Sequence, residues 1–241
     1  GKYPTFDKKY WFASQMRRRA PGSEFAQGLF LSNTATYDCL DWGLEQAIDY
    51  AEARRVAADV GVELEQQATI FLANQALLNL EDLFATDFMT TSVWGTDNTT
   101  ATDWDTQDTS DPVNDVLLAR RTIREATGAF VNTMVMGGIV HDALVNHPDL
   151  IDRVKYTTQA TSSTVDTALS ASFGLDVLVG LATENTANLG AAATMAPFID
   201  DDCLVCHVQP GAGLFGATAG KTFIWDGVGG QGTIAQYEDP S

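Results

Sequence analysis

The motif Cys203-x-x-Cys206-His207 is the part of the sequence whose residue types and spacing most clearly suggest cofactor chemistry. A C-x-x-C-H run is the attachment signal for c-type haem, and two cysteines with a histidine are also a partial zinc ligand set. Haem attachment requires both thiols on one side of a helical turn. The surrounding run CLVCHV instead predicts a strand, in which residues three apart point to opposite faces. We therefore expect two buried strand cysteines, with a metal- or haem-binding protein as the alternative.

Two histidines and three aspartates close together in the sequence offer acid–base chemistry or metal ligands. They are His141, Asp142, His147, Asp149 and Asp152. No nucleophile, zinc-protease or dinucleotide-binding motif accompanies them. Because a residue before proline is disfavoured in a helix, His147 is expected to be a turn residue at a helix boundary. We predict a protein that is not an enzyme, with no catalytic residue and no cofactor.

Two further segments are incomplete versions of ligand-binding loops. Asp103, Asp105 and Gln107 have the spacing of calcium ligands, but Asp108 stands where the sharp turn needs glycine, so a solvated loop is expected. Residues 216–222, GATAGKT, imitate a phosphate-binding loop, but only three residues separate the glycines and a strand is expected to follow instead of a helix. We predict no metal site in either segment.

The chain has 241 residues, 45% of them hydrophobic, and a formal net charge of −18. It is long enough to bury the core of one or two domains. Such a charge repels nucleic acid and anionic membranes over most of the surface. Three cysteines are too few for a disulfide scaffold and favour a reducing compartment. No apolar run of eighteen residues and no signal peptide is visible, so we expect a soluble protein, either processed before Gly1 or part of a longer product.

A long helix from Gly61 to Met89 is the expected organising element. Its apolar residues recur at three- and four-residue steps, which predicts an amphipathic helix of about 40 Å with a mechanical role. They are Leu64, Ala68, Phe71, Leu72, Leu78, Leu83 and Phe84. Asp59 is the expected cap, and no glycine or proline interrupts the run.

The rest of the chain mixes helices and strands without strict alternation, which predicts an α+β fold. Asp111 and Pro112 should start a helix that ends at Gly128, with Val113, Val116, Leu117 and Ile123 on its buried face. Further helices are expected at residues 44–58, 139–146, 149–154 and 165–173. Strands are expected at residues 132–136, 176–179 (of the buried type), 204–208 and 222–225.

The first 42 residues have no core of their own. Residues 1–26 combine aromatic side chains with the basic run Arg17-Arg18-Arg19 and have no clear period. They are expected to become ordered either on a neighbouring molecule or on their own domain. Residues 28–42 predict an extended hairpin or loop, with turn residues at 32–34.

Several segments, in one order, resemble the major capsid proteins of tailed bacteriophages. They are FATDFMTTSVWGTD (84–97), DPVNDVLLARRTI (111–123), NTMVMG (132–137), LVNHPDLIDRVKYT (144–157), VLVGLATENTA (177–187) and KTFIWDG (221–227). The resemblance implies the Hong Kong 97 type capsid fold, with an N-terminal arm at 1–26 and an extended loop at 27–58. It further implies a peripheral domain at 59–126 and 220–241, built on the spine helix 61–89, and an axial domain at 127–219.

The resemblance also implies a function. Members of this family form hexamers and pentamers of an icosahedral head in the host cytoplasm and enclose double-stranded DNA without binding it specifically. Portal, scaffold, protease or decoration proteins are further partners, and no membrane is involved. For this chain it implies a virion structural protein, with Arg17, Arg18, Arg19 and Trp42 as candidate contacts between subunits. A shell of the encapsulin type, which encloses a protein cargo, is the alternative with the same fold.

Overall fold

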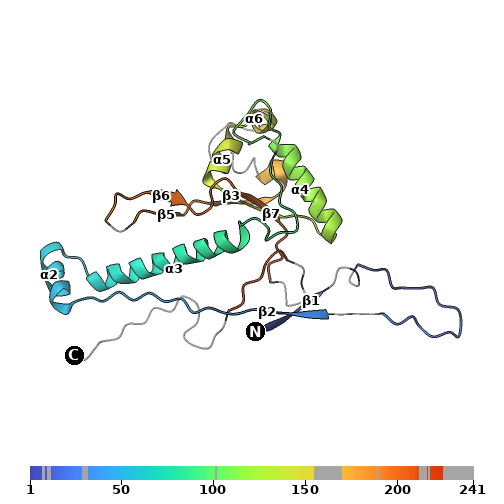
Figure 1. The fold of residues 1–241 in the computed structure, drawn as a ribbon, viewed down its shortest axis with the longest axis horizontal. Helices are drawn as coiled ribbons and strands as arrows, with labels where there is room; N and C mark the ends of the chain where they lie inside the picture. The colour runs from blue at the N-terminus through green and yellow to red at the C-terminus, as the bar shows by residue number, and fades with distance from the viewer. Residues whose placement is uncertain are drawn as a thin grey trace. The chain divides into compact units, whose positions relative to one another are not determined.

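The computed structural model describes residues 1–6, 9, 12–28, 32–100, 102–154, 170–188, 190–211, 216 and 218–224. The chain forms two compact units, one made of Gly1–Gly43 with the segment that begins at Gln209, the other made mainly of Leu44–Val208. The described residues contain helices and three small sheets (Figure 1). The α+β class is therefore confirmed, while the domain boundaries expected from the resemblance stay predictions.

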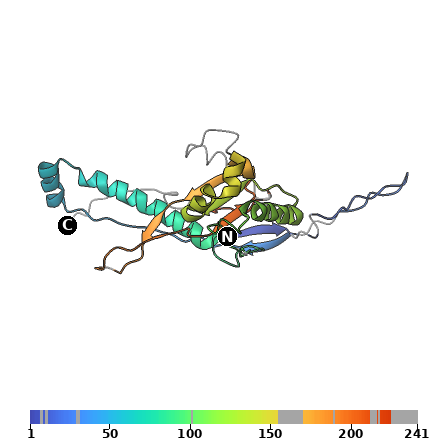
Figure 2. The same cartoon turned by 90° about the horizontal axis from the view of Figure 1, so that it is seen from above.

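The first unit is built on a long antiparallel hairpin. Strands β1 (Lys2–Phe6) and β2 (Ser32–Thr36) pair from Lys2 opposite Thr36 to Phe6 opposite Ser32. The described tip, residues 12–28, has no regular structure and is exposed almost throughout; Figure 2 shows its two legs running together. The turn expected at residues 32–34 is wrong, because these residues are paired in β2. The partner strand β1, which contains Pro4, was not expected at all.

Aromatic rings hold the returning chain in this unit. The rings of Tyr37 and Phe223 stack with centroids 4.2 Å apart, and Tyr3 lies 5.3 Å from Phe223. Residues 222–224 form no strand, which corrects the strand expected at 222–225; Trp225 lies outside the described residues. Ring stacking, not ladder hydrogen bonding, therefore fixes Phe223 in place.

The second unit begins with two helices, α2 (Tyr50–Val60) and α3 (Leu64–Phe88). Asp49 caps α2, its carboxylate accepting a 2.7 Å hydrogen bond from the amide of Ala51. Gly61, at φ 72°, ends α2 in the left-handed conformation. The expected long helix therefore starts three residues late, and Asp59 lies inside α2 instead of capping α3. The 25 residues of α3 still span about 37 Å.

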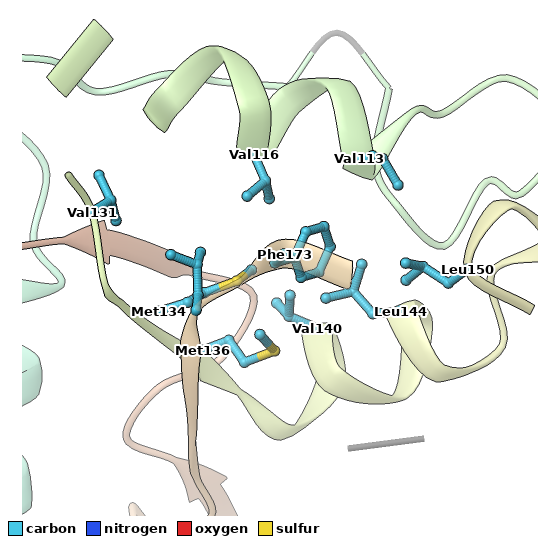
Figure 3. Close-up of a cluster of buried hydrophobic side chains, with 10 residues drawn as sticks. Val113, Val116, Val131, Met134, Met136, Val140, Leu144, Leu150 and Phe173 are labelled. Carbon is cyan, nitrogen blue, oxygen red and sulfur yellow. The ribbon is translucent and has the colours of Figure 1, made fainter. Parts of the chain in front are cut away.

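A three-stranded mixed sheet carries the core of this unit. Strand β3 (Thr133–Gly137) lies in the middle, parallel to β4 (Asp176–Gly180) and antiparallel to β7 (Cys203–Cys206). Helices α4 (Pro112–Thr127), α5 (Gly138–Val145) and α6 (Pro148–Val154) contribute further apolar side chains (Figure 3), and Val131, Phe173 and Leu175 come from the segments that precede β3 and β4. The buried cluster consists of Val113, Val116, Val131, Met134, Met136, Val140, Leu144, Leu150, Phe173 and Leu175.

Helix α4 confirms most of what its sequence predicts. The Asp111 carboxylate accepts a 3.0 Å hydrogen bond from the amide of Asn114, and Gly128 ends the helix at φ 69°. Val113 and Val116 are buried, but Leu117 is 50% exposed and so does not belong to the buried face.

Of the remaining predictions, some are confirmed by the structure and some are wrong. The strands at 132–136, 176–179 and 204–208 are confirmed as β3, β4 and β7 to within one or two residues, and the helices at 139–146 and 149–154 as α5 and α6. Strand β4 lies at the sheet edge and is half-exposed, so the buried type was wrong. The short hairpin of β5 (Thr183–Asn185) and β6 (Met195–Pro197) was not expected. Of the helix expected at 165–173, the structure describes only residues 170–173, which are helical.

Candidate functional site

The Cys203–His207 motif lies on and just after β7, with its two thiols on opposite faces of the sheet. Cys203 packs against the core cluster with Val205, whereas Cys206 is buried on the other side. The His207 Nδ1 atom lies 2.6 Å from the carbonyl oxygen of Phe130, so Nδ1 carries the proton and donates. The three side chains therefore do not converge on one point.

The thiol chemistry also disfavours a metal. Burial raises the pKa of the Cys203 thiol to about 12, with the nearby Asp202 carboxylate adding to the shift, and burial also raises the pKa of Cys206. Zinc binds the thiolate, which these surroundings oppose. Within the described ranges, no three His, Cys, Asp or Glu side chains are grouped closely enough to hold a metal ion, and this includes the Asp103–Asp105 loop.

His147 is completely buried, which its place before Pro148 did not indicate. Its Nδ1 accepts a 3.3 Å hydrogen bond from the amide of Asp149, so Nε2 carries the proton and donates to the Ser110 hydroxyl at 3.1 Å. The hydroxyl in turn donates to the carbonyl oxygen of Thr106 at 2.9 Å. In an activated serine the histidine nitrogen accepts the proton of the hydroxyl. Here the nitrogen that faces the Ser110 hydroxyl carries a proton, so it cannot act as the base. This chain of hydrogen bonds ties the 103–110 loop to α6.

The three arginines predicted as contacts lie on the exposed tip of the β1–β2 hairpin. Neither Arg17 nor Arg18 forms an ion pair with any part of the chain that the structure describes. Arg19 donates a hydrogen bond to the carbonyl oxygen of Ser23. Trp42, the fourth predicted contact, belongs to the irregular segment after β2 and is 63% exposed. The predicted contact residues are therefore accessible, and most of them occur on one loop.

Helix α3 in the second unit exposes an unusual number of apolar side chains. It has no buried residue, and Ile70, Phe71, Leu77 and Leu80 are 45–65% exposed. Successive residues of a helix point 100° apart, so these side chains and their half-buried neighbours surround the helix on every side. Its charged residues are all acidic: Glu65, Glu81, Asp82 and Asp87. No described helix of the protein is long and apolar enough to cross a membrane.

A shallow pocket of about 380 Å³ lies between α2 and the start of α3. Figure 1 shows these two helices next to each other. Its lining comes from the extended segment before α2 and from both helices. The residues are Gln46, Ala47, Ile48, Asp49, Glu52, Leu64, Gln67, Ala68 and Phe71. The sequence pattern does not predict this pocket, because it runs the long helix through Gly61, where the structure separates the two helices that form the walls.

The fold has a solved counterpart. It is similar to the crystal structure of a phage-related protein from Bordetella bronchiseptica RB50, with a TM-score of 0.66 and 24% sequence identity. The match covers 95% of this chain and 75% of that one. No protein-family model matches the sequence, and no curated protein does. At this identity the likeness concerns the fold.

Proposed function

We propose that this chain is the major capsid protein of a tailed bacteriophage, with the Hong Kong 97 type fold. In this proposal it assembles into the hexamers and pentamers of an icosahedral head around double-stranded DNA. The order of the sequence segments supports the proposal, and so does the fold shared with a phage-related protein. The observation that carries it is the exposed apolar helix α3.

An apolar helix without a buried face requires a partner. Helices that are apolar on all sides are normally covered, and monomeric proteins rarely expose contiguous apolar surface of this kind. Obligate interfaces between identical chains are large, commonly above about 2,000 Å², and more apolar than transient ones. A spine covered by neighbouring copies therefore accounts for α3 better than an isolated subunit does.

The β1–β2 hairpin fits the same proposal. A two-stranded hairpin is marginally stable in water unless it packs on something else. Its described tip, residues 12–28, has no regular structure and exposes Phe12, Met16 and Phe25. In the proposal this hairpin is the extended loop of the capsid fold, which the resemblance alone places further along, at residues 27–58. It would be stabilised by lying on a neighbouring subunit.

The charge of the chain is compatible with enclosing DNA without binding it. A wall made of subunits with a net charge of −18 repels the phosphate backbone, so it does not hold packaged DNA in place. Portal, scaffold, protease and decoration proteins are the further partners that the proposal implies.

Electron microscopy and sizing of the purified chain test this proposal. Closed shells tens of nanometres across are the expected result, and a monomer or small oligomer at every concentration would overturn it. The contents of native particles distinguish a virus from a compartment. Double-stranded DNA inside supports the phage head, whereas a protein cargo supports the encapsulin-type alternative.

A further inference from the structure

The hairpin tip contains a locally ordered turn. The amide of Ser23 donates a 3.2 Å hydrogen bond to the carbonyl oxygen of Ala20, and the Ser23 hydroxyl donates to the same oxygen at 2.9 Å. Pro21 and Gly22 occupy the central positions, and Gly22 has φ 83°. Proline followed by a residue at positive φ is the signature of a type II turn. The tip is therefore preorganised at this point, although it has no regular secondary structure.

This turn presents an aromatic ring and a guanidinium group as one unit. The Arg19 guanidinium lies 4.4 Å from the centroid of the Phe25 ring, and Arg19 also bonds the turn through the carbonyl oxygen of Ser23. Phe25 is 76% exposed despite this contact. We call Arg19, the turn 20–23 and Phe25 the tip knob. Arginine and aromatic residues of this kind dominate the energetics of protein interfaces.

The α2–α3 pocket has the complementary chemistry. Ile48, Leu64 and Phe71 form its apolar walls. The carboxylates of Asp49 and Glu52 also belong to its lining. The pocket is a shallow depression of about 380 Å³ that is largely open to solvent, with room for one or two large side chains. Phe71 is 45% exposed, so the pocket has a ring available for contact.

We propose that the tip knob of one copy inserts into the α2–α3 pocket of a second copy, with Phe25 against the apolar walls and Arg19 beside the carboxylates. The inference rests on the proposed function and names the two surfaces that would join neighbouring subunits.

Charge complementarity identifies a second copy as the occupant. The described tip, residues 12–28, carries three arginines and one carboxylate, Glu24, in a chain whose overall charge is −18. Helix α3, which forms one wall of the pocket, has no basic residue. Helix α2, which forms the other wall, carries Arg54 and Arg55, and Arg55 lies 3.8 Å from the Glu52 carboxylate, but neither arginine lines the pocket, whose charged residues are Asp49 and Glu52. The knob is also ordered before it binds, so association loses less conformational freedom than the docking of a floppy loop. A basic, aromatic knob and an acidic, apolar pocket are thus present on the same polypeptide.

Cysteine trapping between differently tagged copies tests the contact. One copy carries Glu24→Cys beside the knob, and the other carries Gln46→Cys or Gln67→Cys in the pocket lining. Both carry Cys39→Ser, since the remaining native thiols lie in β7, Cys206 buried and Cys203 half-buried against the core. Each chain then has one introduced thiol, so a mixed disulfide can join only two different copies. The matched control is Asp82→Cys on α3, about 22 Å from position 67 along the helix axis.

The two tagged copies are co-expressed, assembled, oxidised and analysed on non-reducing gels, while electron microscopy of the same sample reports shells independently. A mixed dimer with either pocket cysteine and not with Asp82→Cys is the expected result. Shells without that dimer, or equal trapping at Asp82→Cys, would overturn the inference and leave the proposed function intact. Absence of shells under all conditions would reject both.

A second pair of variants checks the role of the ring. Phe25→Ala should reduce the yield of the mixed dimer at least tenfold, because it removes the group that fills the pocket. Phe12→Ala deletes another exposed ring of the same tip, 58% exposed and outside the turn, and should leave the yield unchanged. Equal yields from the two variants would contradict the assignment of Phe25.

Discussion

Replacing Leu77 on α3 by glutamate separates a role in assembly from a role in folding. Leu77 is 65% exposed in the single chain, so its substitution should change the free energy of unfolding by no more than about 0.5 kcal/mol. Full burial of a leucine side chain stabilises by about 1.5–3 kcal/mol, so covering the exposed part contributes about 1–2 kcal/mol per subunit. An unpaired glutamate in the same interface costs a further few kcal/mol. We expect subunit association to weaken by a factor of about 100 or more.

Gln75→Glu is the matched control, because it adds the same charge almost isosterically at a position about 160° around the helix from Leu77. Chemical denaturation of unassembled protein measures folding, and sedimentation with electron microscopy measures assembly over a concentration series. Leu77→Glu should unfold like the parent chain and fail to form shells, whereas Gln75→Glu should form them. If Leu77→Glu assembled at the concentration of the parent, or lost several kcal/mol of folding stability as an unassembled chain, the argument from exposed α3 would be refuted.

Three further outcomes concern the second unit. Gly137→Ala should destabilise it by on the order of several kcal/mol, because an added Cβ would overlap the backbone carbonyl oxygens of Ile199 and Asp200. An unchanged melting temperature would contradict that packing. Asp111→Ala removes the cap of α4 and should cost about 1 kcal/mol, with Asp111→Asn retaining most of the stability in the same urea titration. The pKa of the Cys203 thiol is raised to about 12 from the ordinary value of 9.0, so the native state holds this proton more tightly than the unfolded chain. The free energy of unfolding should therefore fall as pH rises from about 9 to 12, and Cys203→Val should flatten that fall.

The sequence was most informative where the determinants of structure are local. The start and end of α4 follow from a capping aspartate, a proline and a glycine within one run, and the structure has all three in those roles. The strands of the central sheet were recognisable because their apolar runs are only a few residues long, which favours a strand over a helix. The Cys203–Cys206 pair was correctly assigned to a strand for the same reason.

Features that depend on distant partners were not predictable in this way. Ser32–Thr36 has the composition of a turn but forms strand β2, because β1, the opposite strand of the hairpin, supplies its hydrogen-bond partners. Gly61 is the same kind of helix-end signal as Gly128, but the apolar pattern on both sides of it favours one longer helix, and only its positive φ shows that α2 ends there. The burial of His147 depends on Ser110 and on helices packed around it, and the α2–α3 pocket depends on two helices that lie next to each other. The sequence pattern predicts neither the burial of His147 nor the α2–α3 pocket.

The topology of the central sheet has a consequence for synthesis of the chain. Strand β7 completes the sheet, yet it is made roughly 120 residues after the end of α3, which at about 5–20 residues per second takes on the order of 6–24 s. Throughout that interval α3 has left the ribosome while the central sheet of the same unit is still incomplete. The nascent chain therefore exposes α3 and the unpaired edge of β3 together, which makes premature association most favourable at this stage. A chaperone that binds apolar helical segments would act at this stage, well before any completed subunit meets another.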